Sequence, residues 1–228
     1  MEEKEMDIEK NKELVLGLLN TCVKREGKDK LLAWLEKSDF FTAPASTKYN
    51  LPIPGGLVEH AINRLKSFLT LLTHRNDIDL NNIIREYSVE GAEESGNLFY
   101  FGNPDTTMES IVLMGLLADV NKVNCYRACI KNVKNKETNK WEEIDGWEWE
   151  EKFIYPTRGT KTVFILQQFI RLFVEEVQAL AFINAGELGL NTIDTTYREI
   201  YEGSPLAVYL HLAEVEAMYV LDGKNESI

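Results

Sequence analysis

Apolar residues that recur every three or four positions are the feature that most restricts the fold of this chain. Such spacing gathers apolar side chains on one face of an α-helix. The predicted helices span Ile8–Arg25, Lys30–Lys37, Leu57–His74, Asn81–Tyr87, Thr106–Asp119, Lys161–Ile170, Val174–Ala185 and Pro205–Leu221. Gly27 ends the first, Thr106 or Thr107 caps the fifth, and Ser204 followed by Pro205 opens the last. The sequence therefore predicts a mainly α protein, with one domain over residues 1–228 and N-terminal helices at 8–37.

Two stretches break the helical pattern. Residues 38–56 hold three of the six prolines and a Gly-Gly pair, so they predict a long loop. Residues 124–155 carry short, partly alternating runs, with turn signals at Asn-Lys-Glu-Thr-Asn and at Asp145-Gly146. We predict a small inserted antiparallel β-ribbon of two or three strands there. Its tryptophans, Trp141, Trp147 and Trp149, either pack the ribbon onto the bundle or form a partner face.

Charge narrows the range of partners. The chain has 25 Lys and Arg against 37 Asp and Glu, a formal net charge of -12. Such a surface repels a phosphate backbone, so long nucleic acid is not an expected partner. A small anionic ligand would need a local cationic pocket. The sequence begins without an apolar signal region and has no membrane-length apolar run, so we expect a cytoplasmic protein with no membrane contact. The three cysteines suit neither a disulfide framework nor a zinc site.

Polar residues inside apolar helical segments are the candidates for chemistry. His60 lies early in Leu57–His74, Asp119 ends an apolar run, and Glu214 interrupts the last helix. His211 is three residues before Glu214 and shares its face. A carboxylate in such a helix needs a partner or a cation, so His60, Asp119 and Glu214 are candidate partners from three helices. Equally, His60 can be a core-edge histidine, Asp119 a helix terminator and Glu214 a solvated residue.

Several strings resemble one family. DFFTAPASTKYNLPIPGGLVEH, IVLMGLLADVNKVNCY, RGTKTVFILQQFIRLFVEEVQALAF and PLAVYLHLAEVEAMYV occur in that order between residues 30 and 222. They resemble segments of the HD-domain metal-dependent phosphohydrolase superfamily, in particular a group common in bacteriophages and prophages. The resemblance implies an HD-like helical bundle in which a His, a His-Asp doublet and a distal Asp hold a divalent cation. That cation activates water to hydrolyse phosphate esters.

Carried over by position, the metal ligands would be His60, Asp119 and Glu214, while Ala118 stands where the doublet has His. Asn50 and Asn184 also stand where the group has histidine, and Arg158 replaces another within Thr157-Arg158-Gly159-Thr160-Lys161-Thr162. The resemblance therefore implies a divalent cation, Mn²⁺ or Mg²⁺, that is weakly held or absent. No catalytic residue is assigned, except Asp119 if the site is active.

A cationic rim survives these replacements. The residues that we assign to ligand binding are Lys48, Tyr49, His60, Lys122, Arg158, Lys161, Asn184 and His211. Arginine suits bidentate phosphate binding. Alternatively, the four cationic residues, Lys48, Lys122, Arg158 and Lys161, are ordinary surface charges.

The leading hypothesis is a catalytically impaired HD-like protein that binds a nucleotide or another phosphorylated small molecule. In a phage it would sequester a host nucleotide signal in the host cytoplasm. One alternative is an active but atypical divalent-metal-dependent phosphohydrolase or phosphodiesterase. Another is a protein-interaction scaffold, and a homo-oligomer is left open.

Overall fold

A computed structural model describes residues 6–88, 107–135, 138–151, 155–183 and 198–222 of the chain. The described part is mainly helical, with one two-stranded antiparallel sheet, as the sequence predicts. The helices are α1 (Ile8–Cys22), α2 (Lys28–Lys37), α3 (Gly56–Thr73), α4 (Leu80–Tyr87), α5 (Met108–Leu117), α6 (Arg158–Leu166), α7 (Val174–Ala181) and α9 (Pro205–Glu216). Residues 198–203 are also helical.

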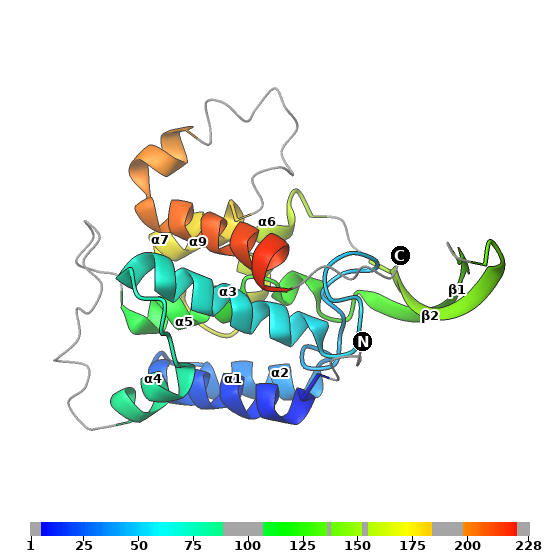
Figure 1. Cartoon of the computed structure of the whole chain (residues 1–228). Coiled ribbons are helices and arrows are strands. Elements are labelled where there is room, and N and C mark those ends of the chain that lie inside the picture. Colours follow the sequence, from blue (N-terminus) through cyan, green and yellow to red (C-terminus); the bar gives the residue numbers. More distant parts are fainter. Residues whose placement is uncertain (1–5, 89–106, 136–137, 152–154, 184–197, 223–228) are drawn as a thin grey trace.

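The helices stack in three tiers (Figure 1). Helices α1, α2 and α4 form one outer tier, α3 and α5 the middle, and α6, α7 and α9 the other outer tier. Helix α3 packs against α5 on one side and α9 on another, while α1 packs on both α4 and α5. The shared core is apolar and includes Leu18, Leu65, Phe68, Ile111 and Leu210, each no more than 1% exposed. Helix α3, in the middle tier, therefore contacts helices of both outer tiers, α1 and α9.

Local chemistry sets the helix ends. Thr107 caps α5 by accepting a hydrogen bond from the Ser110 backbone N–H, and Ser204 caps α9 by accepting one from Ala207. Both caps confirm the sequence prediction. Gly27 has a φ of 90° and directly precedes α2, where a Cβ would lie 1.8 Å from the Phe169 carbonyl oxygen. Helix α6 begins three residues earlier than predicted, because Thr157 caps it through the Thr160 backbone N–H.

The loop at 38–55 is fixed to the bundle despite its lack of regular structure. Its backbone bonds back on itself, from Gly55 N–H to the Thr42 carbonyl at 3.0 Å and from Ala45 N–H to the Leu51 carbonyl at 3.1 Å. Phe40 and Phe41 bury their rings in the core. Such anchoring suits a loop that helps to build a site.

Strands β1 (Tyr126–Lys134) and β2 (Trp141–Trp149) form a ribbon that projects away from the helices (Figure 1). Their register pairs Tyr126 with Trp149 at the base and Lys134 with Trp141 at the far end. The prediction of a turn at Asp145-Gly146 was wrong, because Gly146 lies within β2 opposite Cys129. The strands are joined at the other predicted turn signal, Asn-Lys-Glu-Thr-Asn, where the Asn135 N–H donates to the Lys140 carbonyl at 2.8 Å.

The last predicted helix changes form before it ends. Helix α9 stops at Glu216 and continues as a π-helical segment, η3 (Ala217–Leu221). Asp222 follows, and its N–H closes the wide turn on the Ala217 carbonyl at 2.9 Å. Such wide turns redirect the side chains that follow them and are frequent at functional sites.

The described helices include none that is both long and apolar enough to span a membrane.

Candidate functional site

Three basic and three acidic side chains meet where α3, the end of α5 and the C-terminal helix converge. None of the six side chains is more than 10% exposed. The six are His60, Arg64, Asp119, Lys122, Glu214 and Asp222. Buried ionic groups destabilise a fold unless each charge is compensated. The contacts within the cluster therefore decide what it can do.

Local structure places each member. His60 and Arg64 are one turn apart on α3 and so project from the same face. Asp119 directly precedes a short 3-10 turn after α5, η1 (Val120–Lys122), and Lys122 is the last residue of that turn. Glu214 faces α3 from α9. The turn of η3 then brings the next carboxylate, Asp222, to the other side of His60.

Arg64 lies at the centre of the cluster. Its Nη1 is 2.8 Å from both Asp119 Oδ2 and Glu214 Oε2. Its Nε donates to the Gly115 carbonyl at 2.9 Å, which fixes the plane of the guanidinium. The side chain is completely buried, and burial alone would lower the pKa of Arg64. The charges of Asp119 and Glu214 outweigh that effect and raise the pKa, so the guanidinium is permanently charged.

His60 has a carboxylate beside each ring nitrogen. Its Nδ1 is 2.7 Å from Asp222 Oδ2, and its Nε2 is 3.2 Å from Glu214 Oε2 and 3.3 Å from Asp119 Oδ2. Burial alone would lower the pKa of His60, but Glu214 and then the hydrogen bonds to Asp119 and Asp222 raise it to about 10. The ring is therefore an imidazolium that donates from both nitrogens at neutral pH.

The buried carboxylates are correspondingly ionised. Burial would raise the pKa of Glu214, but the neighbouring His60 and Arg64 hold it at about 2, against the repulsion of Asp119. Burial acts on Asp119 in the same sense, and Lys122, Arg64 and His60 together hold the pKa of Asp119 well below its usual value. Lys122 Nζ is 3.2 Å from Asp119 Oδ2. The cluster thus contains three positive and three negative charges.

His60, Asp119 and Glu214 are close enough to hold a metal ion. Each offers one ligand atom, and these atoms lie within 4.8 Å of one another. These are the three residues that the sequence predicts as candidate metal ligands. Ala118 adds no ligand, since it is fully buried in the apolar core and its carbonyl accepts hydrogen bonds from Thr162 and Asn121. Arg64 already occupies the carboxylate oxygens of this set.

A pocket of about 620 Å³ opens beside the cluster. His60 and Lys122 belong to both the cluster and the pocket, and Arg158 lines the pocket from the start of α6. Loop residues Ser46 and Thr47 also line it. A volume of this size accommodates a drug-sized or nucleotide-sized ligand.

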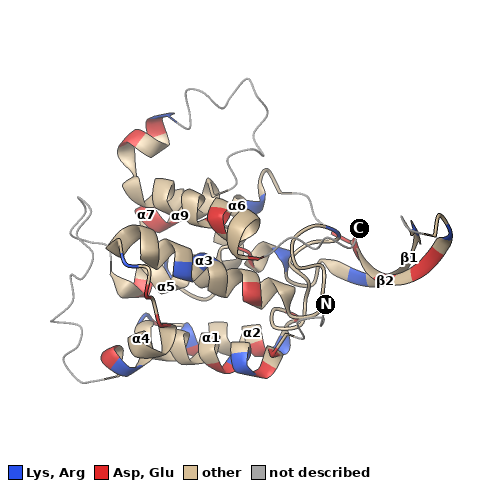
Figure 2. Ribbon diagram, viewed as in Figure 1, with Lys and Arg blue, Asp and Glu red and all other residues tan. Residues whose placement is uncertain are grey.

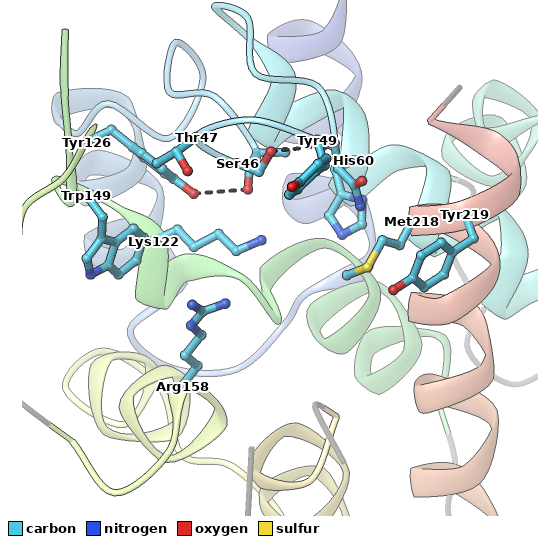
Figure 3. Close-up of a pocket in the computed structure, with 12 residues that line it drawn as sticks. Ser46, Thr47, Tyr49, His60, Lys122, Tyr126, Trp149, Arg158, Met218 and Tyr219 are labelled. Carbon is cyan, nitrogen blue, oxygen red and sulfur yellow. Dashed lines mark hydrogen bonds between the residues drawn. The ribbon is translucent and has the colours of Figure 1, made fainter. Parts of the chain in front are cut away.

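Aromatic side chains lie on two sides of the pocket cations (Figure 3). Tyr126 and Trp149, at the base of the ribbon, are on one side, with ring centroids 5.1 Å apart and edge to face. Tyr49 and Tyr219 are towards the other side, and both are largely exposed. The Arg158 guanidinium lies 5.5 Å from the Trp149 ring centroid. Flat rings beside cations suit a ligand that has both ring systems and negative charge.

Five of the eight predicted ligand-binding residues line a cavity. Tyr49, His60, Lys122 and Arg158 all line the pocket. Lys161 lines a neighbouring cavity of about 450 Å³, where its Nζ is 2.6 Å from Glu151 Oε1 and 3.1 Å from Cys125 Sγ.

The remaining predicted residues lie elsewhere. Lys48 is exposed, and its Nζ lies 5.2 Å from the Tyr49 ring centroid, outside the pocket lining. His211 faces away from the cluster, and its Nδ1 is 2.7 Å from the Ile183 carbonyl. Asn184 falls outside the described residues. Sharing a helical face with Glu214 was therefore insufficient to bring His211 to the site.

The prediction missed Arg64 and Asp222, two central members of the cluster. Arg64 had a signal, because it follows His60 by four residues within an apolar helix and must share its face. Asp222 had none, since its position depends on the π-helical turn of η3. The pocket aromatics Tyr126 and Tyr219 were also missed, because their roles depend on the ribbon base and on that same turn.

Comparison of the chain with family models, curated proteins and solved structures finds no match. The resemblance to the HD superfamily therefore stays a prediction. What the protein does must be inferred from the ion cluster and the pocket beside it.

Proposed function

We propose that this protein is a catalytically impaired, HD-like binder of a nucleotide or another phosphorylated small molecule. The main support for the proposal is that Lys122 and Arg158 line one aromatic-lined pocket in a chain whose net charge is -12. Acidic and basic residues are interspersed on α1, α4 and the ribbon (Figure 2). A pocket that combines two cations with stacking surfaces therefore stands out from the rest of the molecule.

Arg158 is the principal phosphate ligand in this proposal. It begins α6, so backbone N–H groups and the positive end of the helix lie close to its base. Its guanidinium can donate two parallel hydrogen bonds to a phosphate. Lys122 lines the same pocket, and its Nζ also lies 3.2 Å from Asp119 Oδ2.

The aromatic residues supply stacking surfaces for a nucleobase. Stacking of one base on an aromatic side chain is worth about 1–3 kcal/mol. Tyr49 and Tyr219 are 72% and 69% exposed, so an incoming ring can cover surface that is now in water. Rings on both sides of the cations favour a ligand in which two ring systems flank a phosphate.

The ion cluster favours a protein that binds its ligand without hydrolysing it. The cluster is charge-balanced by the protein's own side chains, so ligand binding needs no resident cation. A cytoplasmic protein that holds a nucleotide intact removes it from circulation. In a phage context, which the resemblance implies, such a protein sequesters a host nucleotide signal.

The test is to incubate the purified protein with mono-, di- and cyclic nucleotides, filter it, denature what is retained and identify the retained compounds by mass spectrometry. Calorimetry then measures affinity for the recovered ligand. We expect Arg158→Gln to weaken binding about 10-fold or more, the worth of a hydrogen bond to a charged group. Tyr49→Ala should weaken it with no change in melting temperature. Lys66→Ala, an exposed single-charge change on α3, is the matched control.

Either of two results would remove this proposal. One is that no compound is retained from the mixture. The other is that Arg158→Gln and Tyr49→Ala both bind as the wild type does, which would place the ligand elsewhere.

The second candidate is an atypical metal-dependent phosphohydrolase or phosphodiesterase, favoured by the spacing of His60, Asp119 and Glu214. It predicts hydrolysis products in the same mixture when Mn²⁺ is added, abolished by a chelator and by Asp119→Ala. Intact recovery of every nucleotide with Mn²⁺ present would exclude it.

A further inference from the structure

We infer that Arg64 is the resident cation of the buried cluster. Its guanidinium supplies the positive charge that a divalent ion would supply between His60, Asp119 and Glu214, and it keeps those residues from binding such an ion. The inference concerns the cluster alone and does not depend on which ligand the pocket takes.

The distances identify the atoms in competition. A metal held by Asp119 and Glu214 would need one oxygen from each at about 2.0–2.2 Å. Arg64 Nη1 already lies 2.8 Å from one oxygen of each carboxylate, the normal separation of a charge-assisted hydrogen bond. One nitrogen thus bridges the two carboxylates that the metal would have to bridge.

The third ligand is engaged as well. The Nε2 of His60 faces the same two oxygens at 3.2 and 3.3 Å, while its Nδ1 faces Asp222 Oδ2 at 2.7 Å. Both ring nitrogens thus already have carboxylate partners, and a metal bound to Nε2 would have to replace its contacts with Asp119 and Glu214.

Charge balance leads to the same conclusion. Arg64 Nη1 and Lys122 Nζ both lie within 3.2 Å of Asp119 Oδ2, and Arg64 Nη1 also lies 2.8 Å from Glu214 Oε2. A divalent ion bound to these two carboxylates would lie against two cationic side chains inside a buried cluster, where like charges repel strongly. Removal of Arg64 should therefore favour the entry of such an ion.

Arg64 is held too firmly to leave. Its side chain is completely buried, and its Nε donates to the Gly115 carbonyl on the neighbouring helix at 2.9 Å. Its Nη2 has no hydrogen-bond partner among the described residues, so the pair of carboxylates is the main polar attachment of the group's outer end. Release would leave the guanidinium without its charged partners and would remove one cationic partner from each carboxylate.

The test replaces Arg64 and asks whether a metal takes its place. Arg64→Met removes the charge and keeps an unbranched apolar chain of similar length. We expect Mn²⁺ to raise its melting temperature by about 5–10 °C when the ion exceeds its dissociation constant 100-fold. The same titration should leave the wild type unchanged. The double variant Arg64→Met, Asp119→Asn should lose the Mn²⁺ effect, because it lacks one ligand.

The Arg64→Met variant can be tested even if it does not fold without metal. If Arg64→Met is unfolded without metal, refolding in Mn²⁺ should restore its circular dichroism spectrum. Failure to fold both with and without Mn²⁺ would overturn the inference, as would a folded variant that Mn²⁺ does not stabilise. A third result would overturn the inference as well: electron paramagnetic resonance shows that the protein with Arg64 in place binds Mn²⁺, and Asp119→Asn abolishes that binding.

Discussion

His60 shows how strongly a neighbourhood can alter one residue. It is buried, yet the carboxylates of Glu214, Asp119 and Asp222 raise its pKa from 6.5 to about 10. Protons bound more tightly in the folded state stabilise that state. The contribution of His60 is fully present below its unfolded pKa and is lost as the pH rises through the folded pKa.

We therefore predict that the protein loses stability between pH 6.5 and pH 10, the unfolded and folded pKa values of His60. The free energy of unfolding should fall by at least about 2 kcal/mol over this window, since one pKa unit corresponds to about 1.4 kcal/mol. Denaturant unfolding at a series of pH values measures it. His60→Gln should flatten the curve, and an unchanged slope in that variant would assign the loss to other groups.

The sequence predicted His60, Asp119 and Glu214 both as polar residues in apolar segments and through the family resemblance, and it predicted Lys122 and Arg158 through the resemblance. It assigned Lys161 to the ligand, whereas Lys161 pairs with Glu151 and Cys125. Which of two nearby cations enters a pocket depends on the angle at which its helix docks. Periodicity fixes the face of one helix and leaves that angle open.

At the scale of elements, the close approach of α3 and α5 depends on Gly115. A Cβ at this position would lie 2.7 Å from Leu65 Cδ1 and 3.2 Å from Leu65 Cα. The second contact is with backbone, which cannot move aside without shifting the helix. The same approach brings the Gly115 carbonyl within reach of Arg64 Nε at 2.9 Å.

Gly115→Ala should accordingly destabilise the protein by about 1 kcal/mol. Overpacking costs about 1–3 kcal/mol, whereas the gain in helix propensity is about 1 kcal/mol. Gly17→Ala on α1 is the control, because its Cβ would meet only the end of the Ile84 side chain at 3.0 Å. Thermal unfolding should show a lower melting temperature for the first and no decrease for the second. Equal effects would mean that α3 and α5 can separate freely.

The ribbon is attached at its base and free at its far end. Tyr126 Oη donates to the Ala45 carbonyl at 3.0 Å, and Lys131 Nζ donates to the Thr47 carbonyl at 2.7 Å. Ile130, between these two residues, and Trp141, at the far end, are 61% and 70% exposed. An isolated hairpin adds little stability of its own.

Replacing residues 132–143 with Asn-Gly, which joins Lys131 to Ile144 across their register pair, should leave the melting temperature nearly unchanged. Tyr126→Phe at the base, in contrast, should destabilise by about 1 kcal/mol through the lost hydrogen bond. Differential scanning calorimetry compares the two. A large loss on shortening the ribbon would show that its far end supports the bundle.

The order of the elements was largely predictable, because apolar residues recur at helical spacing in each helix, and α1, α4, α5, α6 and α9 also begin at a side-chain cap. Of the two predicted turns in the ribbon, the one at Asn-Lys-Glu-Thr-Asn lies between the strands, whereas the one at Asp145-Gly146 was wrong, because the strand pairing at 126–149 overrides its turn propensity. The π-helical turn of η3 was unpredictable, because the apolar pattern of Pro205–Leu221 continues through it without interruption.

On the scale of the whole molecule, the net charge of -12 opposes the approach of any anionic ligand to the pocket. Salt screens this long-range repulsion over about 8–10 Å, while contacts at Arg158 act at shorter range. The association rate constant of a nucleotide ligand should therefore rise as ionic strength increases from about 20 to 150 mM. Stopped-flow fluorescence would measure it, and a steep decrease would mean that the pocket cations govern encounter.

The contacts of Asp222 also have a meaning for how the chain reaches this structure. Its carboxylate joins His60 and Asn63, residues about 160 positions earlier, at 2.7 and 3.0 Å. Closing so long a stretch of chain is slow, because its conformational entropy must be lost before the contact forms. We therefore expect the contacts of Asp222 with α3 to be among the last to form as the chain folds. A chain interrupted before residue 222 would leave His60 Nδ1 and the Asn63 amide without this carboxylate partner.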